Sequence, residues 1–125
     1  MNTRALQEFC RSLPGATEDI KWEDHLVFSV GGKMFASFNV DSGVPLGFPC
    51  SDEDFDALTA REGIVPAPYS ARFGWVSVVE KGALAQAAAK GYLAAAHAIV
   101  LAKLPKGKRE AIVAGAMKKA TQRKR

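Results

Sequence analysis

The sequence has 125 residues, a length that favours one domain with a single hydrophobic core. Hydrophobic residues make up 48% and charged residues 24%, which excludes a chain that is disordered throughout. The net charge of +4 hides an asymmetry, because residues 106–125 hold eight of the 17 Lys and Arg but only one of the 13 Asp and Glu. That segment carries +7 and residues 1–105 carry −3, so the basic character belongs to the C-terminal segment.

Cysteine usage and the first residues favour a reducing compartment. Two cysteines are too few for a disulfide framework, and the opening residues Met1 to Arg4 lack the pattern of a secretory leader. A cytoplasmic location is therefore the expectation.

The first predicted element is a helix over residues 4–13. Four apolar residues recur at spacings of three and four, namely Leu6, Phe9, Cys10 and Leu13. Asn2 or Thr3 is suited to cap the helix, and Pro14 with Gly15 is expected to end it.

Three strands are predicted next. Residues 19–23 alternate in polarity, as in a half-buried strand. Residues 26–30 and 33–40 are rich in strand-forming side chains, and only Gly31 and Gly32 separate them. Two residues with free access to positive φ are what a tight hairpin turn requires, so this is the strongest local signal in the chain.

A two-residue turn also predicts which residues of the hairpin face each other. On one face the expected pairs are Val30 with Lys33, Phe28 with Phe35, and Leu26 with Ser37. On the other face they are Ser29 with Met34, Val27 with Ala36, and His25 with Phe38. Neither face is cleanly polar, which predicts a sheet covered by helices on one side and by another layer or subunit on the other.

The middle of the chain is predicted to hold a strand, a helix and a loop. Residues 44–48 form a strand that is expected at a sheet edge, since Pro45 and Pro49 interrupt it. A helix is expected to begin after Ser51 and to end before Gly63. The prolines that follow, within residues 64–73, predict a loop.

A short strand over residues 75–79 and a long helix over residues 82–104 follow. Trp75, like Trp22, is expected to fill the core. The predicted inward stripe of the Ala-rich helix is Leu84, Ala88, Tyr92, Ala95, Ile99 and Ala102. Lys90 lies within this segment, so a membrane span is not expected.

The C-terminal part begins after Pro105, which ends the long helix. Residues 1–105 are predicted to form one α+β domain, and residues 106–125 a basic extension that is partly helical or frayed. One amphipathic helix is expected within that extension, over residues 108–119.

Six short segments, in order, form a recognisable set over about residues 5–110. They are Leu13-Pro14-Gly15-Ala16, Ile20-Lys21-Trp22, Phe28 to Ala36, Gly63 to Tyr69, Trp75-Val76, and Ala102 to Lys106. Together they resemble the MmcQ/YjbR-like family of small bacterial proteins. The resemblance implies an α+β fold in which a curved antiparallel sheet packs against N-terminal and C-terminal helices. It also implies a proposed DNA-binding role through a wing-like arrangement of hairpins.

The basic extension is the strongest candidate for contact with nucleic acid. Its cations are Lys106, Lys108, Arg109, Lys118, Lys119, Arg123, Lys124 and Arg125. Clustered cations suffice to bind phosphates, because counterion release drives that binding. The segment contains no aromatic residue that could stack on a base, so any binding there should be independent of sequence. A solubilising tail, or a tail for acidic partners, is the alternative.

Two further cations are candidates outside the extension. Lys33 follows the hairpin turn, where a lysine either contacts phosphate or protects a strand. Arg72 lies in the loop before Trp75, where the resemblance implies more basic residues in many relatives than this chain carries.

Catalytic and metal-binding arrangements are sparse in this sequence. His25 and His97 lie far apart and have no second ligand at metal spacing, so neither a metal nor a cofactor is expected. Asp24 beside His25 could form an acid–base pair, but a solvated turn is the simpler interpretation. Cys50 precedes a predicted helix, but the carboxylates of residues 52–56 oppose its ionisation.

These observations predict a non-enzymatic cytoplasmic protein that contacts DNA weakly and without sequence preference, mainly through the basic tail. The alternative is a homodimeric protein-interaction or chaperone-like module that uses an apolar sheet face. An enzyme for a small molecule would need a deep pocket lined by His25, Trp22 or Tyr69.

Overall fold

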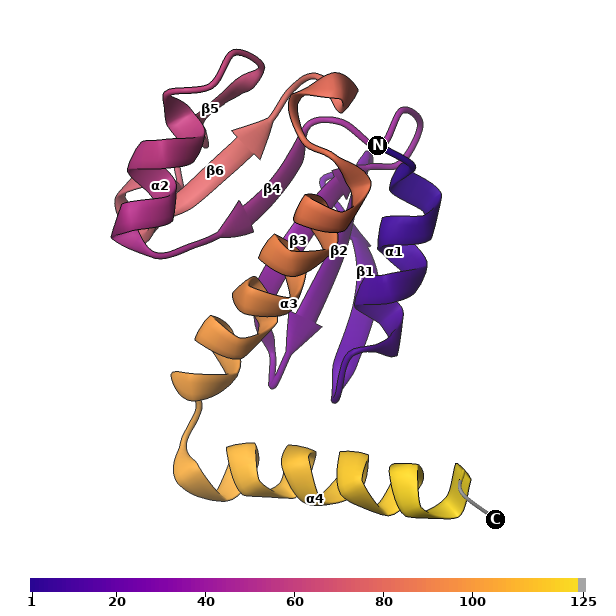
Figure 1. Ribbon diagram of the computed structural model, residues 1–125. Coiled ribbons are helices and arrows are strands. Elements are labelled where there is room, and N and C mark those ends of the chain that lie inside the picture. Colours follow the sequence, from indigo (N-terminus) through magenta and orange to yellow (C-terminus); the bar gives the residue numbers. More distant parts are fainter. Residues whose placement is uncertain (124–125) are drawn as a thin grey trace.

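The computed structural model describes the backbone of residues 1–123 and the side chains of residues 1–117. Within that range, six strands form one antiparallel sheet in the order β1-β2-β3-β4-β6-β5 (Figure 1). The strands are β1 (Ala16–Lys21), β2 (His25–Val30), β3 (Lys33–Asn39), β4 (Leu46–Pro49), β5 (Ile64–Pro66) and β6 (Trp75–Val78). The helices are α1 (Thr3–Ser12), α2 (Asp52–Thr59), α3 (Gln86–Ala102) and α4 (Lys106–Arg123), with short 3₁₀ turns η1 (Ala71–Phe73) and η2 (Lys81–Ala83). The α+β class predicted from the sequence is confirmed.

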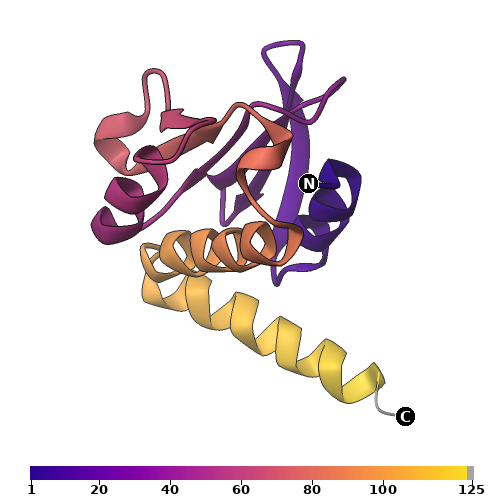
Figure 2. The same cartoon turned by 45° about the horizontal axis from the view of Figure 1, so that its top comes forward.

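Helices α1, α2 and α3 pack on the same face of the sheet. Helix α1 contacts β1, α2 contacts β5 and β6, and α3 lies across β2, β3 and β4. Their buried residues join those of the strands in one continuous core, which includes Phe28, Phe35, Phe38, Phe48 and Leu93. Figure 2 shows the curved sheet on one side of α3 and helix α4 on the other. Among residues 1–123, no helix covers the opposite face of the sheet.

The two short helices begin as their sequences predict. The Asn2 side chain accepts a hydrogen bond from the Ala5 amide at 3.0 Å, and Ser51 accepts one from the Asp54 amide at 3.1 Å. Each cap satisfies a backbone donor that the first helical turn leaves unpaired. At the end of α1, Arg11 forms two hydrogen bonds of 2.8 Å with Glu18, which ties the helix to β1.

The hairpin between β2 and β3 has the predicted turn, but the predicted register is wrong beyond its first two pairs. Val30 pairs with Lys33, whereas Phe28 pairs with Ala36 and not with Phe35. A β-bulge between Phe28 and Ser29 adds one residue to β3, which shifts the later pairs by one.

The bulge also decides which face each hairpin residue occupies. It places Phe28, Phe35 and Phe38 together on the helix-covered face, where all three are fully buried. The helix-free face carries Val27, Ser29, Met34 and Ser37 from these strands, with Gly47, Trp75 and Ser77 from β4 and β6. This face therefore mixes apolar and small polar side chains, as predicted, but among residues 1–123 no helix forms a second covering layer on it, and a covering subunit remains a prediction.

Two predictions about the second half of the sheet are also wrong. Strand β4 is not an edge strand, because it pairs with β3 on one side and with β6 on the other. Pro49 is tolerated within β4 because β3 pairs only with Leu46 and Gly47. The backbone N–H that proline lacks is therefore not needed for a hydrogen bond to β3. The edge is formed instead by β5, within the segment predicted to be a loop.

The predicted long helix is present, but the prediction of which of its faces points into the core is wrong. The buried residues of α3 are Ala89, Leu93, Ala96, His97 and Val100. Of the predicted inward stripe only Leu84, before the helix, is buried, whereas Ala95 and Ala102 are exposed. Alanine on nearly every side of the helix leaves the hydrophobic periodicity too weak to indicate the phase.

Trp22 lies outside the core, contrary to the prediction. Its side chain is 65% exposed in the turn between β1 and β2, where its φ is +53°. Trp75 is half-buried on the helix-free face, above Gly47.

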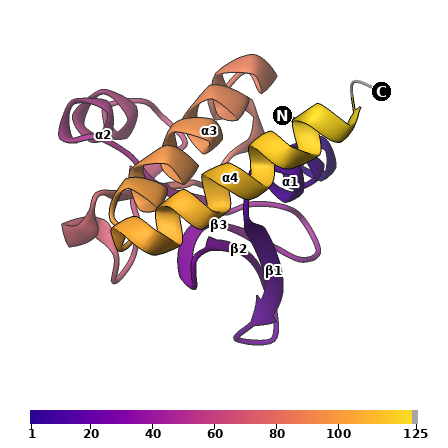
Figure 3. The same ribbon diagram turned by 90° about the horizontal axis from the view of Figure 1, so that it is seen from below.

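Helix α4 docks across the end of the sheet where β2 turns into β3. Figure 3 shows it in front of α1, α3 and β3 when the molecule is seen from below. A side chain at Gly15 would lie 2.8 Å from Ile112 of α4, which shows how closely the helix approaches the turn after α1. None of the helices in the described part of the chain has the length and hydrophobicity needed to cross a membrane.

Candidate nucleic-acid interface

The turn from α3 to α4 packs against the tip of the β2–β3 hairpin. Gly31 has a φ of +58°, and a Cβ there would lie 2.5 Å from Cδ1 of the buried Leu104. The Lys108 ammonium donates a hydrogen bond of 3.2 Å to the Gly31 carbonyl. This contact places the first turn of α4 beside the strand that begins at Lys33.

Five cations from three elements gather at this place, which we call the basic corner. They are Lys33 of β3, Lys103 at the end of α3, and Lys106, Lys108 and Arg109 of α4. The side chains of the four lysines are exposed, and that of Arg109 is half-buried.

Little negative charge balances the basic corner. Lys106 lies 3.9 Å from Glu110, and both side chains are mostly exposed, so water weakens this ion pair. Arg109 donates to the Ala102 carbonyl at 3.2 Å, which orients the guanidinium without neutralising it. Among residues 1–117, no carboxylate pairs with Lys33 or Lys103.

The charge of the first turn of α4 opposes the helix dipole. This turn carries Lys106, Lys108 and Arg109 and contains no acidic residue. Cations at the N-terminus of a helix lie against its positive end, where each costs roughly 0.3–1 kcal/mol. The dipole therefore does not account for these cations: Lys108 and Arg109 hydrogen-bond backbone carbonyls, whereas Lys106 has only its exposed pair with Glu110, and the remaining positive charge suits a negatively charged partner.

The structure brings together four of the cations predicted from the sequence and adds Lys103. Lys103 belongs to the Ala102-to-Lys106 segment that carries the family resemblance, and that segment was the available signal for it. Lys118, Lys119 and Arg123 lie in the last part of α4, where the described part of the structure includes only the backbone. Lys124 and Arg125 lie outside the described residues.

Arg72 lies away from the basic corner, on η1 between β5 and β6. Its guanidinium carbon is 4.8 Å from the centroid of the Phe73 ring, a cation–π contact. Phe73 is 62% exposed and Tyr69 is 99% exposed, and neither aromatic residue was predicted as part of a nucleic-acid interface.

Strand directions place the loop between β5 and β6 at the same end of the sheet as the Gly31–Gly32 turn. Strand β3 leaves that turn, and the antiparallel β4 returns and ends at Pro49, which pairs with Trp75 at the start of β6. Strand β5 ends at Pro66, opposite Val76. The β5–β6 loop therefore shares an end of the sheet with the basic corner, and the turn that carries Trp22 lies at the other end.

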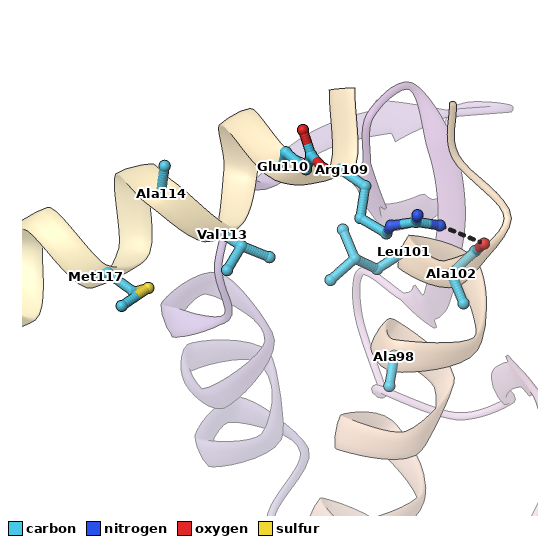
Figure 4. A pocket seen from close by; sticks show the side chains of 8 residues that line it. All are labelled: Ala98, Leu101, Ala102, Arg109, Glu110, Val113, Ala114 and Met117. Atoms are coloured by element: carbon cyan, nitrogen blue, oxygen red, sulfur yellow. Dashed lines mark hydrogen bonds between the residues drawn. The ribbon is translucent and has the colours of Figure 1, made fainter. Parts of the chain in front are cut away.

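A shallow apolar groove of about 400 Å³ runs between α3 and α4. Figure 4 shows its lining residues, which are Ala98, Leu101, Ala102, Arg109, Glu110, Val113, Ala114 and Met117. The sequence suggested that a deep pocket lined by His25, Trp22 or Tyr69 would indicate an enzyme, and none of these residues lines this groove.

The two histidines have different surroundings. His97 is 5% exposed, and its Nε2 donates a hydrogen bond of 2.7 Å to the Pro14 carbonyl, so it links α3 to the turn after α1. His25 Nδ1 lies 2.5 Å from the Asp24 carboxylate in an exposed turn, with the Trp22 ring edge-on at 5.6 Å. Within the described residues, no group of three or more His, Cys, Asp or Glu side chains is arranged to hold a metal ion.

Neither cysteine is poised as a nucleophile. Burial raises the pKa of the Cys10 thiol to about 12. Burial, followed by the charges of Asp54 and Asp52, raises the pKa of the Cys50 thiol to about 11. Both thiols are therefore protonated near neutral pH and react slowly.

Comparison with known proteins places this fold in a family. The YjbR family model matches residues 11–99. The crystal structure of Deinococcus radiodurans protein DR2400, described as a DUF419 domain, superposes with a TM-score of 0.78 over 87% of this chain and 86% of that one. The two share 23% sequence identity, so this similarity concerns the fold. No curated protein matches. A family model that covers most of the chain shows that the protein belongs to the YjbR family.

Proposed function

We propose that this YjbR-family protein is a non-enzymatic DNA-binding protein that holds phosphates at its basic corner, weakly and without sequence preference. The observation that carries the proposal is the gathering of cations from β3, the end of α3 and the start of α4, where Glu110 is the one carboxylate paired with them among residues 1–117. Among residues 1–117, neither Lys33 nor Lys103 has a side-chain hydrogen bond or an ion pair, although Lys103 at the end of α3 complements the dipole of that helix; the lysines of α4 oppose the dipole of their own helix.

Weak and unspecific binding follows from the kind of side chain at the corner. Four of its five cations are lysines, which contact phosphates as mobile point charges and do not form the rigid fork that reads guanine. Affinity would then come mainly from released counterions and would fall steeply with salt.

A charge-neutralising variant tests the proposal better than deletion of residues 106–125. Ile112 and Lys108 pack against the body of the protein, so deletion would disturb the fold as well as the charge. The test variant combines Lys33→Gln, Lys103→Gln and Lys106→Gln, which leaves Lys108 and Arg109 in their backbone contacts.

The matched control combines Lys21→Gln, Arg61→Gln and Lys81→Gln. These three exposed or half-buried cations lie near the opposite end of the sheet, so the net charge changes equally while the basic corner stays intact.

We expect the test variant to bind duplex DNA about tenfold or more weakly at low salt and the control to bind like the unaltered protein. The slope of log affinity against log salt should become shallower by about 0.9 for each phosphate that the variant no longer neutralises. An equal loss of affinity in both variants would show that only net charge matters and would refute the basic corner.

A further inference from the structure

The loop between β5 and β6, residues 67–74, displays aromatic side chains that folding does not use. Tyr69 is 99% exposed and Phe73 is 62% exposed. Tyr69 also has a φ of +68°, a left-handed conformation that bulky residues rarely adopt and that costs free energy. We call residues 67–74 the aromatic loop.

Backbone hydrogen bonds hold the main chain of the aromatic loop, so its exposed rings project from a defined backbone. The Ala71 amide donates to the Ala67 carbonyl at 3.0 Å, and the Gly74 amide donates to the Ala71 carbonyl at 2.9 Å. The Ala67 amide donates across the base of the loop to the Trp75 carbonyl at 3.1 Å. A ligand that stacks on these rings would order little chain on binding, which favours affinity.

The charge of the aromatic loop favours an anionic partner. Arg72 is the only charged residue in residues 63–79, and its guanidinium already stacks 4.8 Å from the Phe73 ring. The loop also lies at the same end of the sheet as the basic corner, with β4 and β6 between the two. A partner that spans this end meets cations at the corner, aromatic faces at the loop and a further cation at Arg72.

We propose that the aromatic loop stacks on unpaired bases, and that the nucleic acid which this protein prefers is single-stranded. This inference rests on the proposed function, because it requires the phosphates of the same strand to lie on the basic corner. A single strand offers both exposed base faces and regularly spaced phosphates, whereas a duplex hides its base faces. An uncharged or basic protein partner would have no use for the cations at this end of the sheet.

The experiment compares an oligothymidine with a duplex of the same length at low salt. The variants are Tyr69→Ala and Phe73→Ala, with Tyr69→Phe as the version that keeps the ring. Trp22→Ala is the matched control, because Trp22 is also an exposed aromatic residue with positive φ but lies at the other end of the sheet. Circular dichroism of each variant checks that the fold is intact.

The unaltered protein should bind the single strand more tightly than the duplex. Tyr69→Ala and Phe73→Ala should each weaken single-strand binding by about tenfold or more and leave duplex binding nearly unchanged. Tyr69→Phe and Trp22→Ala should bind like the unaltered protein.

Other outcomes separate this inference from the function on which it rests. If both loop variants keep full single-strand affinity while the Lys33, Lys103 and Lys106 variant loses it, the stacking proposal is wrong and the DNA-binding proposal stands. Equal reductions of affinity for single strand and duplex would also overturn stacking. If the unaltered protein binds neither nucleic acid at low salt, both proposals fail.

Discussion

Gly31 and Gly32 stand side by side in the hairpin turn, and both have positive φ, yet the two positions meet different surroundings. A Cβ at Gly31 would lie 2.5 Å from the Leu104 side chain, whereas a Cβ at Gly32 would meet no atom of the described residues within 4 Å. The turn geometry requires a residue that tolerates positive φ at both positions. Only the docking of the α3–α4 turn requires the absence of a side chain at Gly31.

We expect Gly31→Ala to destabilise the protein by about 1–3 kcal/mol more than Gly32→Ala, because only the former overpacks a buried leucine. Both variants share the cost of alanine at positive φ, so their difference isolates the contact with Leu104. The difference between the urea midpoints of unfolding of the two variants measures this contact. Equal midpoints would show that Leu104 moves aside without cost.

The two thiols should be unreactive in the folded protein. Since the pKa of Cys50 is raised to about 11 and that of Cys10 to about 12, a disulfide reagent near pH 7.5 should modify both thiols much more slowly in the folded protein than in urea. Asp54→Asn removes one of the charges that raise the Cys50 pKa and should speed its modification modestly. Rapid labelling of Cys50 in the folded protein would contradict this environment.

The Cys10 thiol also makes stability depend on pH. Its pKa is raised on folding from 9.0 to about 12, so above pH 9 the unfolded chain loses a proton that the folded protein keeps. The free energy of unfolding contributed by this group is therefore fully present below pH 9 and is lost as the pH rises towards 12. Urea unfolding at about pH 8 and about pH 10.5 should show a smaller decline in Cys10→Ala than in the unaltered protein.

At the scale of elements, α4 owes its position to a few contacts near its start. Two adjacent residues of α4 differ in role: Ile112 packs against the core near Gly15, whereas Val113 is 42% exposed. This docking keeps the cations of α4 beside the β2–β3 hairpin. The basic corner therefore depends on apolar contacts as much as on charge.

Ile112→Ala should destabilise the protein by roughly 1–2 kcal/mol, below the range for a fully buried isoleucine because the side chain is half-buried. Val113→Ala, the adjacent control, should change stability by less than about 0.5 kcal/mol. Chemical denaturation gives both values, and limited proteolysis should cut α4 faster in Ile112→Ala alone. If the two substitutions destabilised the protein equally, Ile112 would not be the residue that docks α4, and the position of α4 described here would be wrong.

At the scale of the whole molecule, the sheet is covered by helices on one face and, within the described residues, left open on the other. The open face carries Ser29 and Ser37 beside Met34 and Trp75, while Val27 and Ser77 on the same face are buried, so it offers a mixed surface and not a continuous apolar one. The homodimer that the sequence suggested as an alternative would use this face. The contacts within a single chain do not test this alternative.

Native mass by light scattering tests the homodimer. We expect the mass of one 13.4 kDa chain, because small polar side chains interrupt the open face. A mass of two chains that Met34→Asp returns to one would instead establish a dimer through this face. Phe28→Asp cannot serve as the test, since Phe28 is fully buried beneath the helices.

Local signals in the sequence determined the features that a few neighbouring residues decide. Two adjacent glycines predicted the β2–β3 turn, Asn2 and Ser51 predicted helix starts, and the segments shared with the YjbR family predicted the fold class. The uneven distribution of charge was likewise visible without a structure. These features depend on backbone conformation and composition, which short segments specify by themselves.

Only the tertiary structure decided what depends on contacts between distant segments. The bulge moved Phe38 onto the same face as Phe28, whereas the two-residue turn alone predicted it on the opposite face, and pairing on both sides placed β4 inside the sheet. The alanine-rich sequence of α3 did not indicate which face of the helix is buried, and packing against the sheet decided it. Lys33 and Lys108, far apart in sequence, share a corner because the α3–α4 turn docks on Gly31. Such arrangements are set by packing and strand pairing across the whole chain, and local patterns carry little information about either.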